Sequence, residues 1–315
     1  MLASFDFDQA EGLRRMLAGP KPRIVTFLSA TPQDDKGAML VNLGASLAQS
    51  GNDVIIVDAC ERDYGVARRL GVEGGASLLQ VARQECALNQ VIHQVPQGFS
   101  VVKMGHFAMH AHHHVAPAKA GAQVAASSRV REQNWAPAFA GATEGFASAR
   151  GDEARRLANA FDVLVKQSAG SIVIVDGEFS PDGDFPVPVL AASEIVVQVS
   201  TSAASITNAY ALVKRLSQHL GRRPFGILVT GATEAEAKVV YDNMSSAATR
   251  YLAVTLSSMG SVPADEYLQR AARLGRAVVD AFPLAGASVA FRRLAGRFAG
   301  SGAGAGMGVQ QGRAA

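Results

Sequence analysis

Short apolar runs alternate with helical patterns along this chain. The runs are rich in β-branched residues and comprise Ile24–Leu28, Asp53–Val57, Ser100–Met104, Ile172–Val175, Ile195–Val199 and Phe225–Val229. Apolar residues recur at helical spacing in Met39–Gln49, Ala204–Leu220, Glu234–Leu256 and Glu266–Ala272. This alternation predicts an α/β fold with a mostly parallel sheet and helices on both of its faces. Ligands of such sheets bind beyond the carboxyl ends of the strands, so residues that follow strands are the first candidates for a site.

The segment Arg23–Leu47 has the layout of a phosphate-binding loop, which is a strand, a loop with a lysine and a helix. Such loops bind phosphate because glycines let backbone N–H groups converge on it, while a lysine and a Ser or Thr serve the phosphate oxygens and Mg²⁺. Of the usual side chains only Lys36 is present. The departures are Pro32, which lacks an N–H, the acidic Asp34 and Asp35, and Gly37, where the hydroxyl would stand. We therefore expect the fold without its usual activity.

Two acidic residues end predicted strands behind this loop. Asp58 follows the run Val54–Val57 and Asp176 follows Ile172–Val175. An acid in this position organises Mg²⁺ and the attacking water in phosphoryl-transfer proteins. The ordinary alternative is an aspartate that caps the turn leaving the strand. Two such acids behind a lysine-bearing loop favour an inherited nucleotide site.

The segment at about 106–150 breaks the alternation, because it is rich in Ala, Gly and His and has no sustained period. It holds two similar phrases, Pro117–Gln123 and Pro137–Thr143. We interpret it as a disordered surface insertion, since long structureless loops are uncommon in compact domains. Its histidines (His110, His112, His113 and His114) lack the rigid support of a metal site, so no metal is expected there. The Gly- and Ala-rich tail, 300–315, is also expected to be disordered.

Composition excludes several classes of protein. The net charge of +3 over 315 residues does not require a nucleic-acid partner. Cys60 and Cys86 are too few for a disulfide framework and fit reduced thiols in a cytoplasmic protein. No apolar run approaches the roughly 20 residues that span a bilayer.

Residues 1–19 predict a short helix outside the sheet domain. Asp8 and Glu11 have the spacing of a capping box, and Ala10, Leu13 and Leu17 form an apolar stripe. Pro20 and Pro22 separate this helix from the first strand. Docking into a partner fits this arrangement, and a helix folded back onto the domain is the alternative.

Near the other end, Ala290–Phe298 places Phe291, Leu294 and Phe298 on one helical face and three arginines elsewhere. A last core helix with its arginines in solvent is the favoured interpretation. The alternative is a helix that lies on an anionic membrane.

These residues together resemble the MinD/ParA superfamily of ATPases with a deviant phosphate loop, over about Asp8–Phe298 outside the insertion. The residues that match are Lys36 in the loop, Asn42 and Leu43 in the helix after it, Asp58, Asp176, and Val262–Asp265 against an Ile-Pro-x-Asp motif. The departures are Thr31 at the signature lysine, Cys60 at a second acid, and Thr230 at the asparagine that meets adenine. In family dimers the signature lysine crosses to the partner's nucleotide. The resemblance therefore implies a vestigial nucleotide site of Lys36, Asp58, Asp176 and Thr230, with ATP or ADP and Mg²⁺ bound weakly or not at all.

Within the superfamily, the FlhG branch (also called FleN), which controls flagellar number and placement, carries an N-terminal Asp-Gln-Ala-x-x-Leu-Arg motif. Residues 8–14 read Asp-Gln-Ala-Glu-Gly-Leu-Arg and match it. In that family the helix docks on FlhF, a GTPase of the signal-recognition type, and stimulates GTP hydrolysis. The resemblance implies that Asp8, Gln9, Ala10, Leu13 and Arg14 bind this partner and that Gln9 acts at its GTP site.

We therefore expect three parts: a docking helix at 1–19, a MinD-like domain at 20–299 interrupted by the insertion, and the tail. The expected function is regulation of flagellar number and gene expression, with little or no ATPase activity. Flagellar switch proteins or a flagellar transcription activator are further implied partners. The expected location of the protein is the cytoplasm, at the cell pole or the membrane periphery. An active, membrane-associated MinD-like ATPase is the alternative, and a ParA-like DNA partitioner would need a basic surface that the charge does not suggest.

Overall fold

The computed structural model describes residues 22–60, 65–105, 140–179, 185 and 189–300. Its centre is an eight-stranded sheet in the order β3-β4-β2-β5-β1-β6-β7-β8. The strands are β1 (Arg23–Ser29), β2 (Val54–Asp58), β3 (Ile92–Gln94), β4 (Ser100–Lys103), β5 (Ile172–Asp176), β6 (Glu194–Ser200), β7 (Phe225–Thr230) and β8 (Leu256–Val262). β3 pairs with β4 antiparallel, and the other neighbouring strands are parallel. The predicted α/β class is confirmed.

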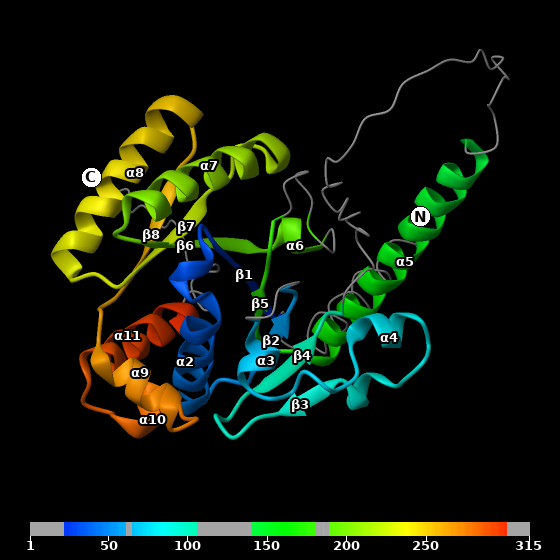
Figure 1. Cartoon of the computed structure of the whole chain (residues 1–315), viewed down its shortest axis with the longest axis horizontal. Coiled ribbons are helices and arrows are strands. Elements are labelled where there is room, and N and C mark those ends of the chain that lie inside the picture. The colour runs from blue at the N-terminus through cyan, green and yellow to red at the C-terminus, as the bar shows by residue number, and fades with distance from the viewer. Residues whose placement is uncertain (1–21, 61–64, 106–139, 180–184, 186–188, 301–315) are drawn as a thin grey trace, which may run out of the picture.

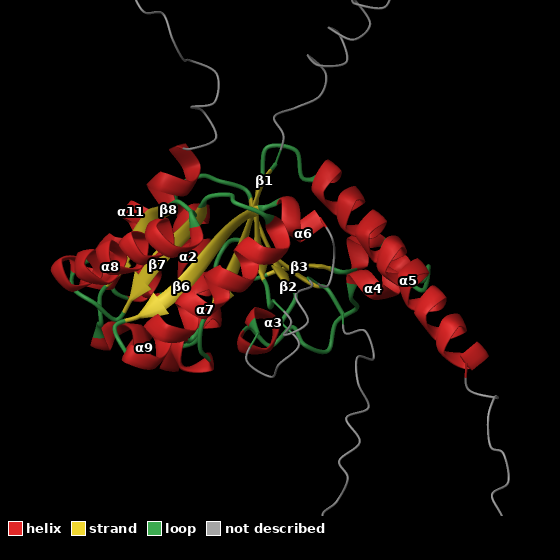
Figure 2. Cartoon of the chain, turned by 90° about the horizontal axis from the view of Figure 1, so that it is seen from above, coloured by secondary structure: helices red, strands yellow, loops and turns green. Residues whose placement is uncertain are grey.

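Helices cover both faces of the sheet (Figure 1). They are α2 (Lys36–Gln49), α3 (Val66–Arg69), α4 (Leu78–Ala82), α5 (Ala140–Gln167), α6 (Val189–Ala192), α7 (Ala203–Leu220), α8 (Glu234–Leu252), α9 (Glu266–Arg273), α10 (Val278–Ala281) and α11 (Gly286–Gly300), with single 3₁₀ turns η1 (Pro32–Asp34) and η2 (Leu88–Gln90). Figure 2 shows α4 and α5 on the opposite side of the molecule from α8 and α11. Within the described part of the chain, no helix combines the length and apolar character needed to cross a bilayer.

Alternate residues of each central strand belong to hydrophobic cores on opposite faces of the sheet. On β2, Val54 and Ile56 pack with α2, whereas Ile55 and Val57 pack with α4 and α5. A third cluster lies under α7 and α8. Burial on both sides explains why the central strands read as continuous apolar runs in the sequence.

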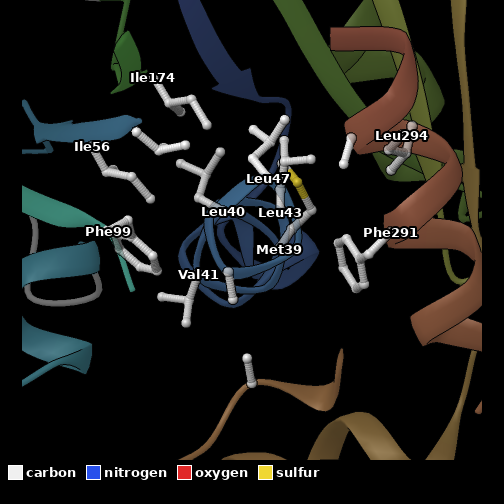
Figure 3. Close-up of a cluster of buried hydrophobic side chains, with 14 of the residues drawn as sticks. Met39, Leu40, Val41, Leu43, Leu47, Ile56, Phe99, Ile174, Phe291 and Leu294 are labelled. Atoms are coloured by element: carbon white, nitrogen blue, oxygen red, sulfur yellow. The ribbon is translucent and has the colours of Figure 1, made fainter. Parts of the chain in front are cut away.

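Helix α2 is the centre of the first core. Its side chains Leu40, Leu43 and Leu47 are fully buried, and Figure 3 shows them between the sheet and α11. Gly44 allows the close approach, because a Cβ there would lie 2.8 Å from Ile56 Cδ1. This packing fixes the start of α2, and with it the loop from β1, at the carboxyl end of the sheet.

The C-terminal pattern forms a core helix. In α11, Phe291, Leu294 and Phe298 are buried. The Phe298 ring lies 5.7 Å from that of Phe27 on β1. The face considered for membrane binding therefore covers the sheet.

Several elements differ from the sequence interpretation. β3 and β8 were not predicted, and α8 ends at Leu252, so residues up to 256 are not all helical. β8 reads Leu-Ser-Ser-Met-Gly-Ser-Val, which has neither an apolar run nor strict alternation. As an edge strand it is buried less than its neighbours, so it carries little of the hydrophobic signal.

The insertion also has a different boundary. α5 begins at Ala140, so residues 140–150 are helical, while 106–139 lie outside the described residues. The C-terminal half of α5 packs on the sheet through Leu157, Phe161 and Leu164. A helix nucleated by such packing extends readily into an alanine-rich sequence. The docking helix at 1–19 and the tail from 301 also lie outside the described residues.

Candidate nucleotide site

The loop between β1 and α2 folds into a tight turn. After Ser29 the chain forms the 3₁₀ turn η1, and Asp35 then adopts a left-handed conformation (φ 44°, ψ 57°) at the start of α2. The strand, loop and helix lie in the predicted order. The glycine-dependent curve of a phosphate loop is replaced by a turn that begins at Pro32.

The two acidic residues of the loop accept hydrogen bonds from groups around them. One oxygen of Asp34, Oδ2, accepts from Thr31 N at 3.2 Å and from Ser205 Oγ of α7 at 2.9 Å. Oδ1 of Asp35 accepts from Ala38 N at 3.2 Å, at the N-terminus of α2. The same oxygen pairs with Arg69 of α3 at 2.5 Å. Side-chain carboxylates therefore satisfy donors that a bound anion would otherwise use.

The Lys36 side chain points beneath the loop. Its Nζ lies 2.8 Å from Asp176 Oδ1, and the Asp176 side chain is 1% exposed. It also donates to the carbonyl oxygens of Phe27, at 3.3 Å, and Gly177. Lys36 and the strand-end acid Asp176 thus form a buried ion pair.

Asp58 lies beside this pair, because β2 and β5 are in register and place Asp58 next to Asp176. Its carboxylate accepts from Ala67 N at 2.7 Å and from Cys60 N at 3.0 Å. Burial, reinforced by the negative charge of Asp176, raises the pKa of Asp58 from 3.8 to about 6. The two backbone hydrogen bonds and Lys36 oppose this shift and do not cancel it.

The carboxylates of Asp58 and Asp176 also hold the N-terminus of α3 in place. Asp176 Oδ2 accepts from Val66 N at 3.2 Å, so two strand-end acids bind the first N–H groups of this single-turn helix. Gly65 is needed at the approach, because a Cβ there would lie 2.5 Å from Asp58 Oδ2. Any larger residue would displace the carboxylate.

Thr230 lies farther along the sheet, at the end of β7. Its hydroxyl accepts from Gln198 Nε2 at 3.2 Å, and the same nitrogen donates to the Asp34 carbonyl oxygen. Sequence reasoning missed Gln198. The sequence could have indicated it, because Gln198 is the single amide in the apolar strand Glu194–Ser200. A polar side chain buried there needs a hydrogen-bond partner.

Three of the four predicted nucleotide-site residues thus meet directly: Lys36, Asp58 and Asp176. Thr230 joins them only through Gln198 and the loop. The partner-binding residues Asp8, Gln9, Ala10, Leu13 and Arg14 lie outside the described residues, as do the four histidines. Where the chain is described, no cluster of three or more potential metal ligands occurs. Cys60 is buried, and its thiol donates to Glu178 Oε1 at 3.2 Å.

No family model matches the chain. Solved structures share its fold at low identity. MinD in the MinC:MinD cell division complex of Aquifex aeolicus has a TM-score of 0.59 at 14% identity, over 92% of this chain and 98% of that one. A ParA family ATPase from Chlorobium tepidum has a TM-score of 0.56 at 16% identity, over 88% and 98%. MinD from Pyrococcus horikoshii, solved with Mg-ADP, has a TM-score of 0.56 at 15% identity, over 89% and 98%.

Sequence similarity narrows the relationship. The chain is 30% identical to the antiactivator FleN of Pseudomonas aeruginosa over 260 residues, which are 81% of this chain and 78% of that protein. The fold of the sheet domain described above is that of the MinD and ParA proteins. The chain belongs to the FlhG/FleN family of flagellar regulators, within the MinD/ParA superfamily.

Proposed function

We propose that this protein regulates flagellar number and flagellar gene expression by binding partners, with little or no ATPase activity of its own. Its relationship to an antiactivator supports a regulatory role, and a flagellar transcription activator is one proposed partner. The proposal rests on one observation: carboxylates within the loop between β1 and α2 already bind backbone N–H groups of that loop and of the start of α2. Asp34 and Asp35 accept from the backbone N–H groups of Thr31 and Ala38, which a phosphate would need.

The remaining chemistry of the loop also argues against turnover. Lys36 is bound to Asp176, and the residue after it is Gly37, which has no hydroxyl for Mg²⁺. A nucleotide would have to displace two carboxylates and break a buried ion pair. ATP or ADP with Mg²⁺ is therefore proposed to bind weakly or not at all.

The proposed GTPase-stimulating element is the N-terminal motif. Residues 8–14 precede Arg23, where the chain enters the amino end of β1, and the degenerate loop lies at the carboxyl end of the same strand. Loss of nucleotide chemistry in the loop is therefore compatible with partner binding through residues 8–14, because the two functions use different residues.

The full-length protein should accelerate GTP hydrolysis by its cognate FlhF-type GTPase. Gln9→Ala should reduce the stimulated rate with little loss of binding, because Gln9 is proposed to act at the GTP site. Leu13→Asp should abolish binding, because a charge would enter an apolar groove. Asp242→Asn, which removes an exposed carboxylate on α8, is the control and should stimulate as the wild type does. Unchanged GTP turnover with the wild-type protein would refute the proposal.

A further inference from the structure

Helix α3 is a single turn that is held at both ends. Its first two N–H groups donate to Asp176 and Asp58, at 3.2 and 2.7 Å. At its last residue, the Arg69 guanidinium lies 2.5 Å from Asp35 Oδ1. So short a helix has little stability of its own. It therefore depends on these contacts and on the burial of Val66 and Ala67 in the core.

Asp35 connects α3 to α2. The oxygen that pairs with Arg69 also accepts from Ala38 N, at the N-terminus of α2. Unpaired N–H groups and the helix dipole favour an anion at this end of a helix. In phosphate-binding loops the nucleotide phosphates occupy that place. Here the left-handed backbone of Asp35 brings a carboxylate over the helix end, and aspartate tolerates this conformation better than most residues.

We propose that the Asp35 carboxylate is a built-in anion, which takes the place of a nucleotide phosphate at α2 and holds α3 through Arg69. In nucleotide-dependent switches, phosphate orders neighbouring segments and its loss releases them. An aspartate is neither hydrolysed nor exchanged, so this end of the sheet stays ordered without nucleotide. The inference concerns the same site as the proposed function and does not depend on the GTPase partner.

Replacing the Asp35 carboxylate by an amide offers a test that preserves shape. Asp35→Asn keeps the size of the side chain and a residue type suited to a left-handed backbone, and it removes the charge that Arg69 needs. Amide hydrogen exchange of the full chain should then rise several-fold at residues 66–70, with the strands unchanged. Asp242→Asn is the matched control, because it removes a carboxylate from an exposed pair with Lys238 on α8. It should leave α3 unaffected.

A second variant tests the claim that a phosphate's place is filled. Asp35→Gly vacates the position with a residue suited to positive φ, so inorganic pyrophosphate at constant ionic strength should restore protection at residues 66–70. Wild-type protection should not change. Thr233→Gly removes the side-chain cap of α8 and serves as the control, in which pyrophosphate should protect nothing.

Three results would overturn the inference. The first is unchanged exchange at residues 66–70 in Asp35→Asn, which would make the Arg69 pair an ordinary surface contact. The second is a rise spread evenly over the sheet, which would mark global destabilisation. The third is failure of pyrophosphate to protect Asp35→Gly, or equal protection of Thr233→Gly. None of these measurements involves GTP hydrolysis, so failure here is distinguishable from failure of the proposed function.

Discussion

Two carboxyl groups and one ammonium group share a buried space at the ends of β2 and β5. Lys36 pairs with Asp176, which leaves Asp58 with the cost of burial and a negative neighbour. The backbone N–H groups of Cys60 and Ala67 compensate only in part. At residue scale, the site therefore disfavours the ionised form of Asp58.

The raised pKa of Asp58 predicts how the stability of the protein changes with pH. The pKa is about 6 in the folded protein and 3.8 for the unperturbed group, so between these values the folded state binds more protons than the unfolded state. The contribution of Asp58 to stability therefore falls as the pH rises from about 4 to about 6 and is constant above that. Asp58→Asn should remove this loss, which amounts to roughly 3 kcal/mol for a shift of this size.

Urea unfolding of both proteins at pH 4 and pH 7 measures the effect. The variant should gain stability relative to the wild type between the two pH values, and Asp242→Asn should not. A pH-independent difference between Asp58→Asn and the wild type would contradict the assignment.

At the scale of elements, the sequence predicted what hydrophobic periodicity determines. The six apolar runs became strands β1, β2, β4, β5, β6 and β7, because each is buried on both faces. β3 and β8 were not predicted because they lie at the two edges of the sheet, where fewer apolar residues are needed. Asp58, Asp176 and Lys36 could be placed in the site because the carboxyl ends of parallel strands converge there. The Asp35–Arg69 pair could not, since it depends on a single left-handed residue and a one-turn helix.

Helix α11 offers a test of its role in the core. Phe291 is 1% exposed on the inner face, and Val289 is 44% exposed on the outer face. Phe291→Ala should lower the free energy of unfolding by about 3–5 kcal/mol, because it removes buried apolar surface and leaves a cavity. Val289→Ala should change it by less than about 0.5 kcal/mol. Equal, small effects in denaturant unfolding would mean that α11 does not pack on the sheet in solution.

For the whole molecule, different parts of the chain carry the two proposed roles. The N-terminal motif precedes the amino end of β1, and the filled loop, α3 and the strand-end acids lie at the carboxyl end. Residues 106–139 follow β4, so the chain enters that segment at the carboxyl end too. The family relationship shows a flagellar regulator. Variants in residues 8–14 and variants in the loop can therefore separate partner binding from order at the carboxyl end of the sheet.

Assembly in response to nucleotide is the property that would best distinguish the proposed regulator from an active MinD-like ATPase. Family dimers use a signature lysine that crosses to the partner's nucleotide, and Thr31 stands in its place. Thr31 is 9% exposed, its N–H donates to Asp34, and its carbonyl oxygen accepts from Ser29 Oγ at 2.7 Å. It is therefore held inward by the loop and carries no charge to offer a second subunit.

We expect the mass measured by light scattering to be that of a monomer and to stay the same when ATP and Mg²⁺ are added. Steady-state phosphate release should equal that of Lys36→Ala, because the wild-type loop is proposed to support no turnover. Thr31→Lys alone should not create a dimer, since Asp34 and Asp35 would still occupy the loop donors. An ATP-dependent doubling of mass in the wild-type protein would show that nucleotide displaces both carboxylates, and it would restore the active ATPase as the better account.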